Sequence, residues 1–176
     1  MTDRLFFDTD CLSSFLWVGR EDIVLLNYSD RIVIPQFVYE EFCRPCVQHL
    51  RHKLDNMLNM KAVLKMEIEN DSVEGKLFRK LTKNPEQDRA VIGKGEASAL
   101  VLAKSNGGIC ASNNLRDVKQ YAEEFGIPIM TTADILTEAF STSYITLEEG
   151  DNIWKAMVYK GRRLPAGSFG DYLRML

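Results

Sequence analysis

The stretch Arg4-Leu-Phe-Phe-Asp-Thr-Asp10 sets the organisation of the rest of the chain. Its three consecutive apolar residues predict a short buried strand that ends where Asp8 begins. In an open parallel sheet, the carboxyl ends of the strands open into a crevice, so a carboxylate there can reach solvent and a ligand. Asp8 is therefore the first candidate for chemistry. The alternative is that Asp8 caps the helix that follows, since Asp is an ordinary N-cap residue.

Length and composition indicate one domain with one well-buried core. The chain has 176 residues, of which 45% are hydrophobic and 27% are charged, and we treat residues 1–176 as a single domain. The net charge of -3 argues against a broadly basic surface that coats nucleic acid, although a local basic patch beside an acidic pocket is compatible with it. The N-terminal apolar run is too short and too acidic for a signal peptide, and no stretch reaches the length of a membrane span. We therefore expect a soluble, cytoplasmic protein without a membrane partner.

The cysteines suggest a metal site at first sight. Cys43, Cys46, His49 and His52 follow one another at steps of three, which resembles a zinc-ligand pattern. On a helix, however, each step of three turns the side chain by about 60°, so the four side chains fan out and cannot converge on one ion. A Cys-x-x-Cys redox pair normally opens a helix after a strand, whereas this pair trails a helix. A packed helical turn with free thiols is the default expectation.

Glutamates follow the second predicted strand. Residues 31–34 form an apolar run closed by Pro35, and the helix expected over 36–42 carries Glu40 and Glu41 just behind that strand end. A second strand thus brings acidic side chains to the same edge of the sheet. The alternative for such a pair is a solvated helix face.

The second half of the chain alternates between helix and strand. The small residues around 92–103 predict a helix packed tightly on the sheet, with Glu96 in its first turn, where the helix dipole favours an anion. A Gly-x-Gly phosphate loop is weakly supported here, because no strand directly precedes it. A strand at 109–111, a polar cluster at 112–117, a helix to Phe125, a strand at 127–130 and a helix through Phe140 follow. This alternation predicts an α/β fold whose parallel sheet has helices on both faces.

Apolar spacing, together with a capping pattern at Ser72, predicts the remaining elements. Helices are expected at 12–18, 21–28, 49–59, 72–81, 145–159 and 168–176, and an amphipathic edge strand is expected at 61–68. Residues 43–83 look like an excursion from the basic fold, and residues 141–176 look like a helical C-terminal extension.

Four segments together resemble the PIN-domain nuclease family over about residues 4–140. They are apolar-Asp-Thr-Asp up to residue 10, Ile-Pro-x-x-Val-x-x-Glu-Phe at 34–42, Gly-Glu-Ala-x-Ala-Leu at 95–100, and Ser-Asn-Asn-Leu-Arg-Asp at 112–117. The resemblance implies a three-layer α/β/α, Rossmann-like fold with a mainly parallel central sheet and extra C-terminal helices. It also implies a metal-dependent endoribonuclease that acts on RNA and is similar to the toxins of toxin–antitoxin pairs, so that an antitoxin is a candidate partner. A homodimer is expected from the C-terminal extension and not from the resemblance.

The family's acidic positions fall on four residues of this chain: Asp8, Glu41, Glu96 and Asp117. Glu40 is the alternative to Glu41. At the fourth position, many family members carry an Asp where this chain has Asn113 or Asn114, whereas toxin-type members resemble its Asn-x-x-Asp arrangement. The resemblance gives supporting roles to Thr9, Ser112, Asn113 and Asn114.

Elementary chemistry agrees with these implied roles. Carboxylates that converge without a cationic partner repel one another unless a divalent cation neutralises them. Oxygen-only ligands select Mg²⁺ or Mn²⁺ over zinc, so we expect Asp8, Glu96 and Asp117 to hold such an ion, with Glu41 completing the site. Lys94 and Arg116 are candidates for contacting substrate phosphates, with solvated surface as the alternative.

Other roles for the chain stay open. Arg162 and Arg163 in the extension are expected either to help cover the sheet or form a homodimer, or to contact RNA or an antitoxin. Asp8 and Asp10 after a strand also fit a haloacid-dehalogenase-like phosphatase, but the later lysine and acidic motif of that class do not appear in proper context. A catalytically silent PIN-like module that binds RNA or protein is the other alternative.

Overall fold

A parallel sheet forms the centre of the computed structural model, which describes residues 3–83 and 91–176. Within those residues the sheet has five strands in the order β3-β2-β1-β4-β5, and each pairs in parallel with its neighbours. The strands are β1 Leu5–Phe7, β2 Ile32–Pro35, β3 Leu64–Met66, β4 Ile109–Ala111 and β5 Ile129–Met130. The α/β class and the parallel sheet predicted from the alternating pattern are therefore confirmed.

The helices begin and end close to the positions that apolar spacing predicted. They are α1 Thr9–Val18, α2 Glu21–Tyr28, α3 Gln36–Phe42, a 3₁₀ turn Pro45–Val47, α4 Gln48–Asn59, α5 Val73–Lys83, α6 Lys94–Asn106, α7 Leu115–Phe125, α8 Thr132–Ser141, α9 Leu147–Tyr159 and α10 Phe169–Leu173. Three expected elements are clearly shorter in the structure. The edge strand spans 64–66 instead of 61–68, the last strand spans 129–130 instead of 127–130, and the last helix spans 169–173 instead of 168–176.

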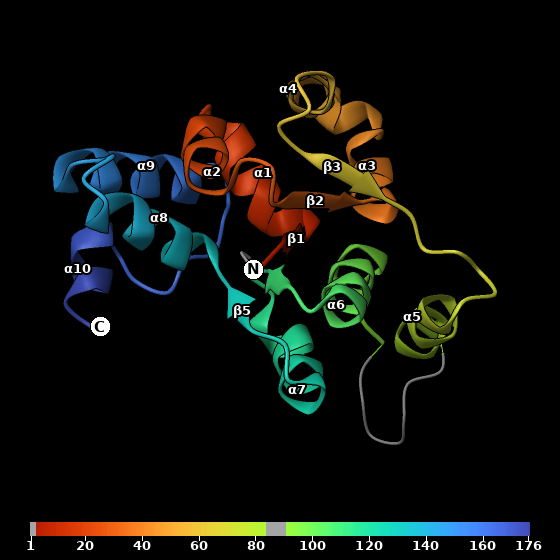
Figure 1. The fold of residues 1–176 in the computed structure, drawn as a ribbon. Coiled ribbons are helices and arrows are strands. Elements are labelled where there is room, and N and C mark those ends of the chain that lie inside the picture. The colour runs from red at the N-terminus through yellow and green to blue at the C-terminus, as the bar shows by residue number, and fades with distance from the viewer. Residues whose placement is uncertain (1–2, 84–90) are drawn as a thin grey trace.

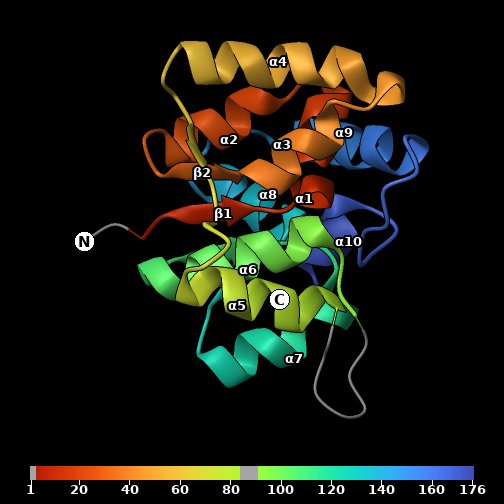
Figure 2. The ribbon, with the colours of Figure 1, turned by 90° about the vertical axis from the view of Figure 1, so that its right-hand side faces the viewer.

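Successive strand residues point to opposite faces of the sheet, as the pleat requires. Leu5 and Phe7 of β1 join the core under α1, α2, α4, α8 and α9, whereas Phe6 joins the core under α5, α6 and α7. The sheet thus lies between two helical layers, which Figure 2 shows above and below β1 and β2. Because both faces are covered, the strands are continuous apolar runs.

The strand order reverses between β1 and β4, and this reversal fixes the position of the candidate site. Phe7 pairs with Ala111, so the residues that follow the two strands, Asp8 and Ser112, emerge side by side. The Asp8 amide also donates to the Ala111 carbonyl oxygen at 2.9 Å. The carboxyl ends of β1 and β4 therefore form the switch-point crevice where open α/β sheets bind ligands.

The two added segments lie at opposite sides of the molecule (Figure 1). The segment at 43–83 supplies α4, the edge strand β3 and α5, and the expected edge position of β3 is confirmed. The C-terminal segment supplies α9 and α10, and the indole nitrogen of Trp154 donates to the Ala166 carbonyl oxygen at 3.0 Å. Among the described residues, no helix is both long enough and apolar enough to cross a bilayer.

Candidate active site

Asp8 is placed at the switch point by two groups that donate hydrogen bonds to its carboxylate. The Cys11 amide donates to Asp8 Oδ1 at 2.7 Å, which makes Asp8 the N-cap of α1, and the Ser112 hydroxyl donates to Oδ2. The capping interpretation of Asp8 is therefore confirmed, and it coexists with a place at the crevice. The expectation that this carboxylate reaches solvent is wrong, because the cap turns it onto α1 and leaves the residue only 1% exposed.

Negative charge converges around this buried carboxyl group. Burial raises the pKa of Asp8 from 3.8 to about 7. The hydrogen bonds from Ser112 and Cys11 lower the pKa, whereas the charges of Asp10 and Glu96 raise it further. Asp10, in the first turn of α1, and Glu96, in the first turn of α6, therefore lie close enough to disfavour the ionisation of Asp8.

Asn114 joins two further acidic positions. It occupies the N-cap position of α7, but its side chain makes no capping bond. Its side-chain Nδ2 instead donates to Glu96 Oε1 at 3.3 Å and to Asp117 Oδ2 at 2.9 Å. Asp117 thus reaches the same cluster as Glu96, through an amide that lies between the two carboxylates.

Glu41 enters from α3 at a point where three helices meet. A Cβ added at Gly95 of α6 would lie 3.0 Å from Thr9 Oγ1 of α1 and 3.3 Å from Glu41 Oε1. Thr9 Oγ1 is buried without a hydrogen-bond partner. Glu40 is exposed and accepts a hydrogen bond from Gln36 on its own helix. Of the two glutamates, the structure therefore brings Glu41 to the cluster.

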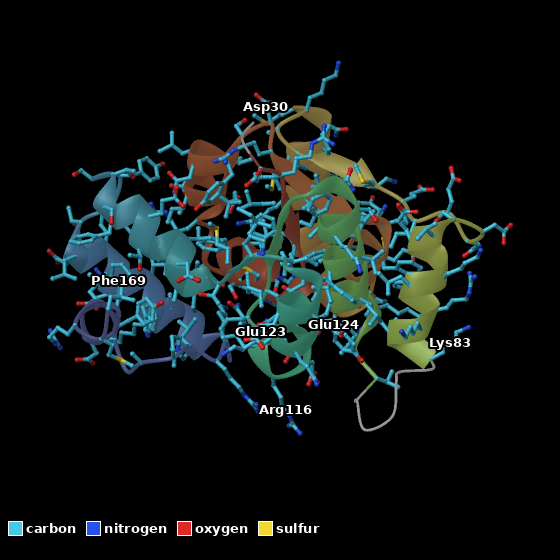
Figure 3. The ribbon with its side chains drawn as sticks, turned by 60° about the horizontal axis from the view of Figure 1, so that its bottom comes forward. Asp30, Lys83, Arg116, Glu123, Glu124 and Phe169 are labelled. Atoms are coloured by element: carbon cyan, nitrogen blue, oxygen red, sulfur yellow. The ribbon has the colours of Figure 1, made fainter. Side chains whose placement is uncertain are left out.

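Three other expected site residues remain: Asn113, which links neighbouring elements, and the cations Lys94 and Arg116. Asn113 accepts from the Thr132 amide at 2.8 Å and donates to Asp10 Oδ2 at 3.3 Å, so it ties the end of β4 to α8 and α1. Lys94 lies 5.8 Å from the centre of the Phe37 ring. The side chain of Arg116 points away from the body of the protein (Figure 3). Asn113 therefore belongs to the frame of the site, whereas the structure does not bring Arg116 to it.

A hollow of about 420 Å³ opens beside these residues and adds Asp10 and Arg162 to the site. It is lined by Asp10, Glu96, Asn113, Asn114, Gly161, Arg162 and Arg163. Arg162 Nη1 donates to Asp10 Oδ1 at 2.8 Å and to Ser13 Oγ at 3.2 Å. The Asp-x-Asp spacing at the strand end could have indicated Asp10, but no local signal shows that Arg162 returns to α1.

The donor chemistry of the cluster suits a hard divalent cation. Every acidic group in it supplies oxygen, and the crowding of Asp8, Asp10 and Glu96 is the situation that such a cation relieves. In the described part of the chain, no three His, Cys, Asp or Glu side chains are already arranged as a metal site. Binding would therefore draw the carboxylates together. Cys43 and Cys46 are exposed free thiols.

The family model described as "DUF3368: PIN domain" matches residues 4–176. A search of curated proteins gives no match. Among solved structures, the chain is similar to the one described as "Crystal structure of DNA bound VapBC from Salmonella typhimurium", with a TM-score of 0.51 and 18% identity. The similarity covers 75% of this chain and 99% of that chain, and at this identity it supports the three-layer fold alone.

Proposed function

Because the chain belongs to the PIN-domain family, whose model spans residues 4–176, we propose that it is a metal-dependent endoribonuclease. The observation that carries this proposal is the convergence of acidic side chains at the switch point, where Asp10 and Glu96 line one hollow beside the buried Asp8 and Asn114 joins Glu96 to Asp117. A crevice with several carboxylates suits metal-assisted hydrolysis of a phosphodiester. The likeness to a VapBC structure supports a further proposal, that the chain is a toxin-type nuclease with an antitoxin partner.

In the proposed site, Asp8, Glu96 and Asp117 hold Mg²⁺ or Mn²⁺, and Glu41 completes the set. When bound, such an ion lowers the pKa of a water molecule and neutralises charge that develops on the phosphodiester. The protein's own contribution is to position these side chains. Ser112 and the Cys11 amide fix the Asp8 carboxylate, and the Asn114 amide sets the separation of Glu96 and Asp117.

The family match favours this function over a haloacid-dehalogenase-like phosphatase. That class needs a lysine beside its first aspartate. Among the described residues that line the central hollow, the cations are Arg162 and Arg163. A PIN-like module that binds RNA without cutting it is the second candidate, because both oxygens of Asp8 and Oε1 of Glu96 already accept hydrogen bonds from the protein.

Cleavage of a mixed panel of structured and unstructured RNAs tests the proposal. With Mg²⁺ or Mn²⁺ present, wild type should cut, and EDTA should abolish cutting. Asp8→Asn and Glu41→Gln should each lose about 100-fold or more in rate, since replacing even a residue that orients a metal ligand costs 10- to 100-fold. Glu40→Gln is the matched control, because this exposed neighbour of Glu41 bonds only to Gln36 among the hydrogen bonds described.

Two results would decide against the nuclease. If Asp8→Asn cuts as fast as wild type, or if EDTA has no effect, the carboxylate–metal mechanism is wrong. If no variant cuts and RNA binds equally with and without Mn²⁺, the binding-module alternative takes its place.

A further inference from the structure

Three adjoining hollows cross the candidate site. The central hollow, of about 420 Å³, contains Asp10 and Glu96. A second, of about 200 Å³, contains Thr9 and Glu41 and lies toward α3 and α4, and a third, of about 220 Å³, lies toward α8. Arg162 lines both the central and the second hollow, and Arg163 lines both the central and the third. We call this continuous series of hollows the groove.

The groove carries arginines along its length with carboxylates between them. Arg44 lines the second hollow, Arg162 lines the second and the central one, and Arg163 lines the central and the third. A polyanion entering a centre built from Asp10, Glu96 and Glu41 is repelled unless cations contact its phosphates close by. The chain has a net charge of -3, so local arginines must supply that attraction.

We propose that Arg44, Arg162 and Arg163 form a phosphate-binding track that lays a single strand of RNA across the carboxylate centre. The identity of the substrate as RNA rests on the proposed function. The inference adds that these arginines bind the RNA and that they bind it as a single strand. Hollows of 200 to 420 Å³ walled by side chains suit one strand, whereas a duplex is read from its outer grooves. Arginine forks fit phosphate oxygens in pairs.

A phosphate can replace the hydrogen-bond partners that Arg162 has in the structure. Its Nη1 makes the bonds to Asp10 and Ser13, while its Nε is buried without a hydrogen-bond partner. A buried donor without a partner is unfavourable. The ion pair with Asp10 is partly exposed, with 23% of the Arg162 side chain and 44% of the Asp10 side chain accessible. Turning the guanidinium toward a phosphate would exchange the bonds to Asp10 and Ser13 for bonds to phosphate oxygens and would give Nε an acceptor.

The loop that carries the two arginines is anchored on both sides. At its start, the Arg162 amide donates to the Met157 carbonyl oxygen at 3.0 Å, and Gly161 adopts a φ of 79°. At its end, Ala166 accepts the hydrogen bond from the Trp154 indole. The C-terminal extension thus presents Arg162 and Arg163 from a fixed position, which gives this added segment a role in the site.

RNA binding without metal tests the track separately from cleavage. Fluorescence anisotropy with a labelled single-stranded RNA in EDTA gives Kd as a function of salt. Arg162→Ala/Arg163→Ala should bind about tenfold more weakly at low salt, because each charge-assisted bond is among the stronger hydrogen bonds. The slope of log K against log salt should become shallower by about 0.7 for each phosphate contact removed.

Control variants show whether a change in RNA binding comes from the groove arginines themselves. Arg174→Ala removes one arginine from the same extension without touching the groove, since Arg174 pairs with Asp171, and it should bind as wild type does. Arg163→Ala alone leaves the Asp10–Arg162 pair intact, and Arg162→Lys retains the charge, so these variants separate lost contacts from a displaced loop. Circular dichroism confirms that each variant is folded.

Two outcomes would overturn the track. One is a double variant whose Kd and salt slope equal those of Arg174→Ala. The other is a larger loss from replacing the basic face of α5, Lys76, Arg79, Lys80 and Lys83, which lines a separate hollow; this would place RNA on α5. If binding depends on the groove arginines but no RNA is cut with metal, the proposed nuclease fails while the RNA track stands.

Discussion

Asp8 caps α1, and its burial raises the pKa of its carboxyl group. Its pKa of about 7 lies above the ordinary 3.8, so between about pH 4 and 7 the unfolded chain releases a proton that the folded protein keeps. The free energy of unfolding of the metal-free protein should therefore fall as pH rises through that window. Asp8→Asn keeps an N-cap and should be more stable than wild type at pH 7.5, by roughly 1–4 kcal/mol.

Urea unfolding in EDTA at several pH values measures this difference. Glu40→Gln, which changes an exposed carboxyl group, serves as the control and should follow the wild-type pH profile. If wild type and Asp8→Asn show the same pH slope, Asp8 is already ionised in the folded protein and the burial argument is wrong.

At the scale of single residues, the sequence predicts proximity better than orientation. The resemblance to PIN-domain nucleases predicted that Asp8 and the 112–117 cluster share a site, and the structure places Ser112 against Asp8 and Asn114 against Glu96. That Asn114 spans Glu96 and Asp117 depends on the turn between β4 and α7, which residue types do not determine. Arg162 is 152 positions from Asp10, and only the folded path of the extension brings the two together.

At the scale of elements, Gly95 lets α6 approach α1 and α3. Gly95→Ala should favour the helix by about 1 kcal/mol, but the new Cβ would lie 3.3 Å from Glu41 Oε1 and 3.0 Å from Thr9 Oγ1. We therefore expect little net change in the free energy of unfolding and a roughly tenfold loss of cleavage, because small displacements of a reacting group are costly. Urea unfolding and initial cleavage rates measure the two effects.

The other end of the same helix provides the control. Gly107 ends α6 with a φ of 62° and has nothing within 4 Å of an added Cβ. Gly107→Ala should destabilise the protein by about 1 kcal/mol and leave cleavage unchanged. A Gly95→Ala variant that cuts as fast as wild type would show that Glu41 does not depend on this contact.

The boundaries of the elements follow from sequence where a cap or an apolar stripe marks them. The helices over 21–28, 36–42 and 115–125 were predicted closely because apolar spacing and end signals agree. The strand expected at 127–130 is shorter because Ile127 still closes α7, its amide donating to the Ala122 carbonyl oxygen at 2.8 Å. An apolar run alone cannot distinguish a helix end from a strand start.

At the scale of the whole molecule, the alternation of helix and strand was sufficient to predict the fold class, because parallel strands require helical crossovers. The place of the C-terminal extension was not predictable, since an amphipathic helix shows that it packs but not against what. The homodimer and the single-domain assignment stay predictions.

The extension offers the last prediction, because it couples stability to the groove. Phe169 of α10 is fully buried, and its ring centre lies 5.9 Å from those of Phe140 and Trp154. Figure 3 shows Phe169 among the helices at the C-terminal end of the chain. Phe169→Ala should cost about 3–5 kcal/mol of folding stability. It should also loosen the loop that carries Arg162 and Arg163, and so weaken RNA binding.

Thermal unfolding and metal-free anisotropy, the latter well below the melting temperature, separate these two effects. Met175→Ala, which shortens an exposed side chain at the same end of the chain, should change neither. If Phe169→Ala lowers the melting temperature while the folded variant binds RNA with the wild-type Kd and salt slope, the extension only covers the core. If binding weakens together with stability and the slope becomes shallower, as for Arg162→Ala/Arg163→Ala, the packing of α10 helps to hold the arginines over the carboxylate centre.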